Sequence, residues 1–306
     1  MVRRLVKAAL REDLGSREDV TSLATIPSRH RSTARIIAKE KGVLCGIKAA
    51  AKVFRQRDRS VRLILRARDG SRVRAGQTVL KIRGFTRGIL SAERVALNFL
   101  QRLSGIATLT DQFVQKSKIQ NPKSKILDTR KTTPLLRALE KYAVRCGGGV
   151  NHRAGLYDMV LIKDNHLAAL GGLANRQTGH AGRVCSPIRE AVRRARRRWP
   201  RLKVEVECET LDQAREAAQA RADMILLDNM MPSQLRRAVR IVKGRAKTEA
   251  SGGVTLKTVG AIARTGVDFI SVGALTHSAR SLDFSLEMAG ERDGETRPAQ
   301  ALHKSE

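Results

Sequence analysis

The sequence predicts an α/β fold in which a smaller N-terminal part precedes an incomplete parallel β/α barrel. After residue 110, short apolar strands that end in polar residues alternate with helical stretches, which is typical of a parallel sheet covered by helices. A complete eight-stranded barrel takes about 250 residues, and only about 175 lie between residues 110 and 285. We therefore expect six or seven strands. A doubly wound open sheet is the alternative, but no GxGxxG follows a strand to support it.

The N-terminal domain is predicted to cover residues 1–110. Its first stretch, MVRRLVKAALREDLG, predicts an amphipathic helix with Leu5, Ala8 and Ala9 on one side. Two β-like stretches follow, RIIAKEKGVLCG and VRLILRARDGSRVRAGQTVLKIRG, and glycine-containing turns separate their strands. A helix is expected to begin at Ser91 as its N-cap, with Val95 and the apolar residues at helical spacing after it facing a core.

The barrel is predicted over residues 111–288, with 281–288 packing back onto the N-terminal domain and 289–306 forming a frayed tail. Its strands are expected in six stretches: KSKILDTRK, YDMVLIKDNH, LKVEVECET, ADMILLDN, AKTEASGG and DFISVGALTH. The four cysteines form no CxxC pair, which favours free thiols in a reducing compartment and argues against a zinc site. No apolar run approaches the roughly 18 residues of a membrane span. We expect a cytoplasmic protein.

The formal net charge of +31 has two competing explanations. One is binding to a polyanion such as nucleic acid, since excess Lys and Arg releases counterions from phosphates. The other is an Arg-rich surface on which only a small cluster does chemistry. Basic residues are spread along the chain, most densely over 193–198, and aromatic residues make up only 3%, so platforms for stacking bases are scarce. We therefore predict no specific nucleic-acid function.

Polar side chains gather where the predicted strands end, and in a β/α barrel these ends meet at one mouth. The early strands supply cations, the middle ones carboxylates, and the last two glycine-rich loops. Several cations around one cavity suit carboxylates or phosphate, carboxylates suit Mg²⁺ or ribose hydroxyls, and the glycine-rich loops suit a phosphate. The strand-end residues are Asp128, Arg130, Lys131, His152, Arg153, Lys163, Asp164, Asn165, His166, Glu207, Asp228, Asn229, Ser251, Gly252, Gly253, Ser271 and Gly273.

Some of these residues have simpler structural explanations. Asp128 lies inside a strand end and is expected to position a loop. Glu205 and Glu207 share side-chain parity, so one of them could be a barrel-layer residue paired with a lysine. His166 could only cap a helix, and Thr133 with the following proline suits an N-cap and N1 pair. Glycines 147–149 end that helix and need not touch a ligand.

Seven motifs in order resemble those of the quinolinate phosphoribosyltransferase family, also called nicotinate-nucleotide pyrophosphorylase (carboxylating). They are LSAERVALNFLQRLSGIAT, DTRKTTP, NHRAGLYDMVLIKDNH, VEVECET, LLDNM, EASGG and SVGALTH. The resemblance runs from about residue 12 to 286, and TRKTTP followed by NHR and KDNH is highly specific. It implies an N-terminal α/β sandwich and a seven-stranded incomplete barrel. The sequence departs from the family in a longer Arg-rich stretch at 174–198 and in its higher charge.

The resemblance also implies a reaction and a role for each site residue. Quinolinate and phosphoribosyl pyrophosphate would give nicotinate mononucleotide, pyrophosphate and CO₂, with Mg²⁺, in NAD biosynthesis. Glu207, Asp228 and Lys131 would be catalytic; Glu207 and Asp228 would also hold the metal, directly or through water. The quinolinate residues would be Arg94, Arg130, His152, Arg153 and Lys163. The phosphoribosyl pyrophosphate residues would be Lys131, Glu207, Asp228, Ser251, Gly252, Gly253, Gly273 and His277.

The resemblance further implies a homodimer, or a higher oligomer, whose active site is shared between subunits. Arg94 would then reach the site of the neighbouring subunit, although an Arg paired with Glu93 or Asp111 on the helix surface is the alternative. Two rival functions are a ModD-like paralogue with an unknown substrate and, from another class, a polyanion-binding or nucleic-acid-binding protein. The complete cationic set argues against the paralogue.

Overall fold

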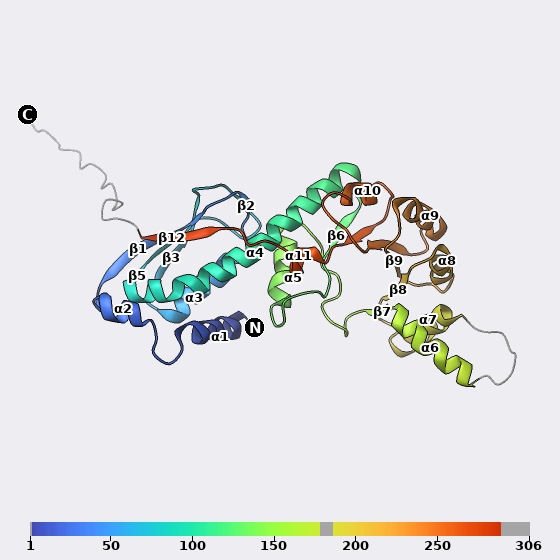
Figure 1. Cartoon of the computed structure of the whole chain (residues 1–306), viewed down its shortest axis with the longest axis horizontal. Coiled ribbons are helices and arrows are strands. Elements are labelled where there is room, and N and C mark those ends of the chain that lie inside the picture. Colours follow the sequence, from blue (N-terminus) through green and yellow to red (C-terminus); the bar gives the residue numbers. More distant parts are fainter. Residues whose placement is uncertain (1, 178–185, 289–306) are drawn as a thin grey trace, which may run out of the picture.

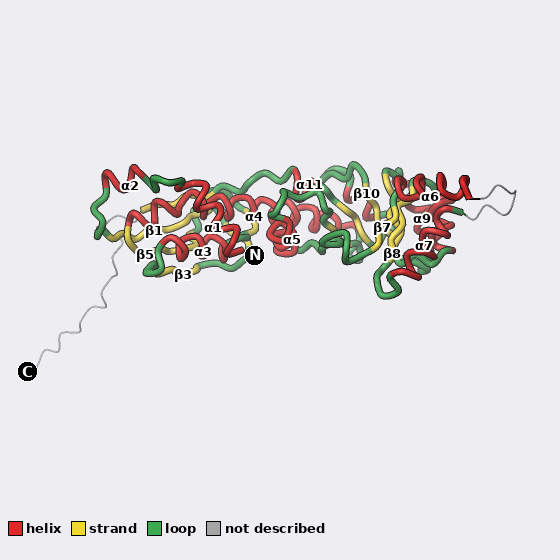
Figure 2. The backbone as a smooth tube through the Cα atoms, turned by 90° about the horizontal axis from the view of Figure 1, so that it is seen from below, coloured by secondary structure: helices red, strands yellow, loops and turns green. Residues whose placement is uncertain are grey.

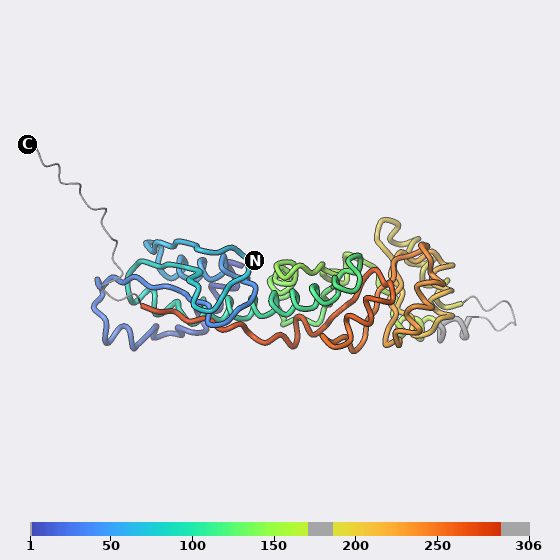
Figure 3. Tube along the Cα trace, turned by 90° about the horizontal axis from the view of Figure 1, so that it is seen from above, coloured from blue at the N-terminus to red at the C-terminus, as the bar shows by residue number. Residues whose placement is uncertain are grey.

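The computed structural model describes residues 2–177 and 186–288, and it shows an elongated molecule with two parts placed end to end (Figures 1–3). One long helix, α4 (Thr86–Gln120), runs from the N-terminal part into the barrel. Its buried side chains belong to both hydrophobic cores: Leu97 packs in the core of the N-terminal part, and Ile106 packs in the core of the barrel. The helix thus fixes the barrel to the domain before it. No helix of the described residues is long and apolar enough to cross a membrane.

The N-terminal part is a four-stranded antiparallel sheet in the order β12-β1-β5-β3, packed against helices. The last strand of the described chain joins this sheet at its edge, where Ile36 pairs with Leu286. A two-stranded sheet of β2 and β4 lies apart from it. The elements are α1 (Val2–Leu14), α2 (Val20–Thr25), β1 (Arg31–Ala38), β2 (Gly42–Val43), α3 (Ile47–Arg57), β3 (Arg62–Leu65), β4 (Arg72–Val73), β5 (Thr78–Phe85) and β12 (Phe284–Met288).

The second part is a six-stranded parallel sheet in the order β6-β11-β10-β9-β8-β7. Val150 adds a single parallel bridge on the free side of β6, next to Leu127, and so stands where a seventh strand would be. The sheet curls into an incomplete barrel, which confirms the predicted fold class and rules out the doubly wound alternative. Its strands are β6 (Lys125–Leu127), β7 (Val160–Ile162), β8 (Val204–Cys208), β9 (Met224–Asp228), β10 (Lys247–Ser251) and β11 (Phe269–Ser271).

Helices follow the barrel strands and cover the sheet from outside (Figure 1). The apolar residues of α9 show how: Leu235 and Ala238 recur at helical spacing and so face inward together. The helices are α5 (Arg137–Cys146), α6 (Asp164–Gln177), α7 (Pro187–Arg198), α8 (Leu211–Gln219), α9 (Pro232–Val242), α10 (Val259–Ala263) and α11 (Ala274–His277).

Two predicted helix starts were wrong. α4 begins at Thr86 and not at Ser91, whose hydroxyl lies inside the helix and donates to the carbonyl of Arg87 at 2.7 Å. Thr133 does not cap α5, which begins at Arg137; instead its hydroxyl donates to the buried carboxylate of Glu140. Both errors have the same cause. Ser and Thr are common at helix N-caps, so each was taken to mark the start of a helix, whereas contacts in the folded chain place that start at another residue.

The first helix forms as predicted, and Leu5 and Ala9 pack against the cores, but they are only partly buried. Val6 and Leu10 are its buried residues, whereas Ala8 is exposed. The predicted tail at 289–306 and part of the Arg-rich stretch at 174–198 lie outside the described residues. The rest of that stretch forms α7, where Glu190 pairs with Arg193 and Arg194.

Candidate active site at the barrel mouth

A cavity of about 780 Å³ opens at the C-terminal ends of the barrel strands. Every residue to which the family resemblance gives a role in the site lines it, with the exception of Arg94, whereas the strand-end candidates Asp164, Asn165 and His166 do not. The side chains come from different strands and meet because parallel strands end at the same edge of a sheet. The predicted residues in the lining are Arg130, Lys131, His152, Arg153, Lys163, Glu207, Asp228, Ser251, Gly252, Gly253, Gly273 and His277.

Two arginines stand close together on the cationic side of the cavity. Burial and the neighbouring charge of Arg130 lower the pKa of Arg153. Within the described residues, neither side chain forms a salt bridge, and Nε of Arg130 is buried without a hydrogen-bond partner. Two like charges held together in this way are favourable only with an anion between them. The geometry therefore calls for an acidic ligand at this point.

Lys163 lines the same cavity, and its ammonium group pairs closely with the carboxylate of Glu207. The lysine side chain is 41% exposed and the glutamate 12%, so the pair is open to the cavity from the lysine side. His166 lies in the first turn of α6 and accepts a hydrogen bond through Nδ1 from the backbone of Lys163 at 2.9 Å. This contact caps the helix, as the sequence suggested, and His166 does not line the cavity.

Asp128 is fully buried and holds the loops that carry the cations. Its carboxylate accepts hydrogen bonds from the ammonium group of Lys141, from the amide of Asn151 and, at 2.9 Å, from the backbone of His152. Burial raises the pKa of Asp128, and the lysine and these donors oppose that shift. The expected positioning role agrees with this network, which fixes where His152 and Arg153 enter the mouth.

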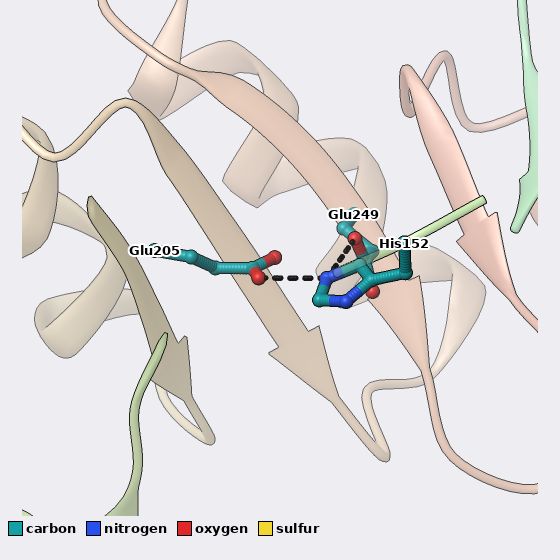
Figure 4. A group of neighbouring side chains, drawn as sticks. All are labelled: His152, Glu205 and Glu249. Atoms are coloured by element: carbon teal, nitrogen blue, oxygen red, sulfur yellow. Dashed lines mark hydrogen bonds and ion pairs between the residues drawn. The ribbon is translucent and has the colours of Figure 1, made fainter. Parts of the chain in front are cut away.

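His152, which lines the cavity, points its Nε2 at two buried carboxyl groups, those of Glu205 and Glu249 (Figure 4). Its Nε2 lies 2.9 Å from Glu205 and 3.5 Å from Glu249, and both glutamates have no exposed surface. Burial raises the pKa of Glu205 to about 7, and burial with the nearby Glu205 raises that of Glu249 to about 8. Burial also lowers the pKa of His152. Two buried carboxyl groups this close cannot both ionise at low cost.

These contacts decide which glutamate belongs to the barrel interior. Glu205 is the buried barrel-layer residue, and its partner is a histidine instead of the expected lysine; Glu207 has the lysine partner. Glu249 was missed, although it stands two residues before Ser251 just as Glu205 stands two before Glu207, so the same parity argument applies to it.

The three side chains offer ligand atoms within 4.8 Å of one another. Those atoms are already engaged with each other, and the positive charges of Lys141 and Arg153 act on His152 from nearby. Both features oppose a cation at this point, so we assign no metal to the cluster.

The raised pKa of Glu249 predicts a pH dependence of stability. Between about pH 4.5, the ordinary value, and pH 8, the folded protein holds a proton that the unfolded chain has released. The contribution of Glu249 to the free energy of unfolding therefore falls as the pH rises through this window. In Glu249→Gln, urea denaturation at a series of pH values should show this fall reduced by a few kcal/mol, because each unit by which the pKa is raised corresponds to about 1.4 kcal/mol. Glu209→Gln, at an exposed position, serves as the control; an equal fall in wild type and Glu249→Gln would contradict the assignment.

The acidic and glycine-rich sides of the mouth are joined by a close backbone approach. Gly252 has a φ of +91°, and a Cβ there would stand 2.1 Å from Oδ1 of Asn229. Asn229 is itself left-handed (φ 54°) and donates from Nδ2 to Asp228 at 2.7 Å. Only glycine fits this contact. On the next strand, Gly273 leaves room for Lys131 and His277, which a Cβ would approach to 3.2 and 3.1 Å.

Arg94 does not line the cavity. It is exposed on α4 and, among the described residues, forms neither a salt bridge nor a hydrogen bond. Burial raises the pKa of the neighbouring Glu93, and the charge of Arg94 opposes that shift only in part. The alternative partner, Asp111, is bound by Arg72 at 2.9 Å. An arginine two turns later was missed instead.

The missed arginine is Arg102, which ties α4 to the barrel mouth. Its guanidinium donates to Glu140 at 2.9 Å and to two backbone carbonyls, including that of Ala279 at 3.0 Å. It also borders a second cavity of about 490 Å³ that shares Lys131 and His277 with the main one. Because Arg102 precedes the barrel in sequence, a search of strand ends cannot find it.

Comparison with known proteins gives matches over nearly the whole chain. The model of the quinolinate phosphoribosyl transferase N-terminal domain matches residues 19–104, and that of the C-terminal domain matches 106–287. A probable nicotinate-nucleotide pyrophosphorylase [carboxylating] of Bacillus subtilis is 42% identical over 288 residues, covering 94% of this chain and 93% of the relative. A quinolinate phosphoribosyltransferase [decarboxylating] of Nicotiana tabacum, named as mitochondrial, is 42% identical and covers 94% and 82%.

Solved structures agree with these sequence matches. NadC from Streptococcus pyogenes superposes with a TM-score of 0.85 at 42% identity, covering 94% of this chain and 96% of that one. The nicotinate-nucleotide pyrophosphorylase from Francisella tularensis gives a TM-score of 0.84 at 39% identity, covering 94% and 96%.

Proposed function

Since the chain belongs to the quinolinate phosphoribosyltransferase family, we propose that the barrel mouth carries out that family's reaction. The reaction transfers the phosphoribosyl group of phosphoribosyl pyrophosphate to quinolinate, with loss of CO₂, and yields nicotinate mononucleotide for NAD biosynthesis. One observation supports it above all. Arg130 and Arg153 meet in a cavity with no acidic partner of their own among the described residues, as a ligand with two adjacent carboxylates requires.

The residues divide the work between the two substrates. Arg130, Arg153, Lys163 and His152 bind the quinolinate carboxylates. The phosphoribosyl pyrophosphate contacts come from Lys131 at the pyrophosphate, from Glu207 and Asp228 at the ribose hydroxyls, and from Ser251, Gly252, Gly253, Gly273 and His277 at the 5′-phosphate. This arrangement follows the cavity, in which the cationic, acidic and glycine-rich loops lie in that order around the mouth.

The chemistry explains why cations dominate. The pyridine nitrogen bonds to C1 of the ribose as the bond to pyrophosphate breaks, and positive charge develops on the sugar between Glu207 and Asp228. The ribosylated ring is then a cation, so it takes the electron pair left when the 2-carboxylate departs as CO₂, and a proton replaces that group. No strong base is needed. The main task of the protein is to hold two polyanions together away from water.

A magnesium ion fits this donor set. Glu207 and Asp228 present hard carboxylate oxygens to the cavity beside the residues assigned to pyrophosphate, and Mg²⁺ prefers such oxygens and keeps several waters. The two carboxylates would hold it directly or through water. When bound, the ion neutralises negative charge on the pyrophosphate.

The active unit is a homodimer, or a higher oligomer, with Arg94 supplied to the neighbouring subunit. Arg94 is exposed, forms no hydrogen bond within the described chain and does not line the barrel-mouth cavity of its own subunit.

A cytoplasmic location fits the free thiols of Cys45, Cys146 and Cys208; Cys185 lies outside the described residues.

The assay that tests this function measures nicotinate mononucleotide and CO₂ formed from quinolinate, with nicotinic acid as the control. Quinolinate should be used and nicotinic acid should not. With one carboxylate missing, cations would stay unpaired in a desolvated pocket at a cost of roughly 1–3 kcal/mol each, which is about ten- to a hundredfold per cation. Comparable turnover of the two acids would contradict the assignment. Turnover of neither would favour the ModD-like paralogue, and a salt-dependent gel shift without turnover would favour a nucleic-acid-binding protein.

A further inference from the structure

A third cavity, of about 980 Å³, lies on the N-terminal domain at helices α1 and α3, which are labelled in Figure 1. Helices α1 and α3 form its walls and lie side by side, and the amide of Gln56 donates to the carbonyl of Arg3 across them at 3.2 Å. We call this cavity the cationic groove. Of its fifteen lining residues, eight are Lys or Arg, whereas these types make up 60 of the 306 residues in the chain. Basic residues are thus enriched in this lining relative to the chain as a whole.

The cations stand in two facing rows set by helical periodicity. On α1 they are Arg3, Lys7 and Arg11, each four residues after the last, and so on one face of the helix. On α3 and the turn after it they are Lys48, Lys52, Arg55 and Arg59, again at intervals of three or four. At 1.5 Å per residue each row is on the order of 10 Å long or more. The two rows therefore line an elongated trough.

These seven side chains lack acidic partners within the described residues. The groove contains one carboxylate, that of Glu18, and Arg57 takes it in a salt bridge at 2.5 Å. All seven cations are exposed. Neighbouring charges along each row lie within the Debye length of about 8 Å at physiological salt, so they repel one another. An anion that spans both rows would relieve that repulsion.

From this geometry we propose that the cationic groove binds a linear polyphosphate chain. Two rows of cations match a run of phosphates better than they match a single phosphate. The lining has no aromatic side chain, and Gln56 is its only amide, so nothing in it stacks on a base or identifies one. Recognition would therefore depend on phosphate charge alone. This proposal does not depend on the catalytic one, because the groove shares no lining residue with the barrel-mouth cavity.

The experiment titrates the full-length protein with fluorescently labelled inorganic polyphosphate and follows anisotropy at several salt concentrations. The test variant reverses two groove charges, Lys52→Glu with Arg55→Glu. The matched control reverses two exposed arginines on α9, Arg236→Glu with Arg240→Glu, so both proteins change net charge equally. We expect the groove variant to bind about tenfold more weakly or worse and with a shallower salt dependence, and the control to bind nearly as the wild type does. Both variants should keep the turnover of quinolinate.

Several results would overturn the proposal. Equal weakening in the two variants would mean that net charge, and not the groove, binds the probe. If the wild type does not bind the labelled polyphosphate even at low salt, the groove is not a polyphosphate site. A single-stranded RNA that binds through the groove while polyphosphate does not would replace this ligand by another. Loss of binding together with altered sedimentation of the groove variant would assign the groove to a subunit interface.

Discussion

Replacement of Glu207 by alanine is expected to lower kcat by about 10²–10³-fold while the KM for quinolinate changes little. The positive charge that this carboxylate stabilises develops on the sugar only in the transition state. Removal of the carboxylate should therefore lower kcat more than it changes KM. In the free protein Glu207 pairs closely with Lys163. Removing the glutamate leaves that lysine available to the carboxylates of quinolinate, which is a further reason for binding to hold.

Steady-state kinetics with both substrates varied would measure this effect. Glu209→Ala is the matched control, because Glu209 is exposed two residues further on and does not line the cavity; it should behave as the wild type does. Glu207→Gln keeps the shape and removes the charge, so it should resemble Glu207→Ala if charge is what matters. If kcat held and only KM rose, Glu207 would be a binding residue, and the catalytic role would pass to Asp228.

Mixing two inactive variants is expected to recover roughly a quarter of the wild-type sites if Arg94 acts on the neighbouring subunit. Arg94→Ala and Lys163→Ala should each be nearly inactive alone. In a mixed dimer, one site carries both lesions and the other carries neither. Random pairing makes half of the dimers mixed, and half of their sites are intact. The position of Arg94, exposed on α4 and away from its own cavity, is the structural reason for this expectation.

The control mixes Lys163→Ala with Arg153→Ala, because both residues line the same barrel mouth. Every site in that mixture carries a lesion, so no activity should return. Exchange of subunits is verified with differently tagged chains separated on an affinity column. If exchange is complete and the first mixture stays inactive, the shared site is wrong, and Arg94 acts within its own chain or not at all.

The sequence alone determined the class of fold and most of the barrel mouth. Apolar strands that end in polar residues predict parallel strands, and the strand-end rule then places Arg130, Lys163, Glu207 and Asp228 at one edge before any coordinates are known. These predictions succeed because they rest on local periodicity and on a geometric property shared by all parallel sheets. The motifs that resemble the family lie at the same strand ends, and for this reason the two lines of argument agree.

Only the tertiary structure decided which side chains face one another across the barrel. Parity puts Glu205 and Glu207 on one face of a strand, but the partner of each depends on what the other strands bring near. In the folded protein, Glu205 and Glu249 are buried and contact His152, whereas Glu207 pairs with Lys163. The start of α4 was likewise decided by contacts distant in sequence. Capping and parity are local rules, and the free energies they carry are small beside those of burial and charge pairing in the folded chain.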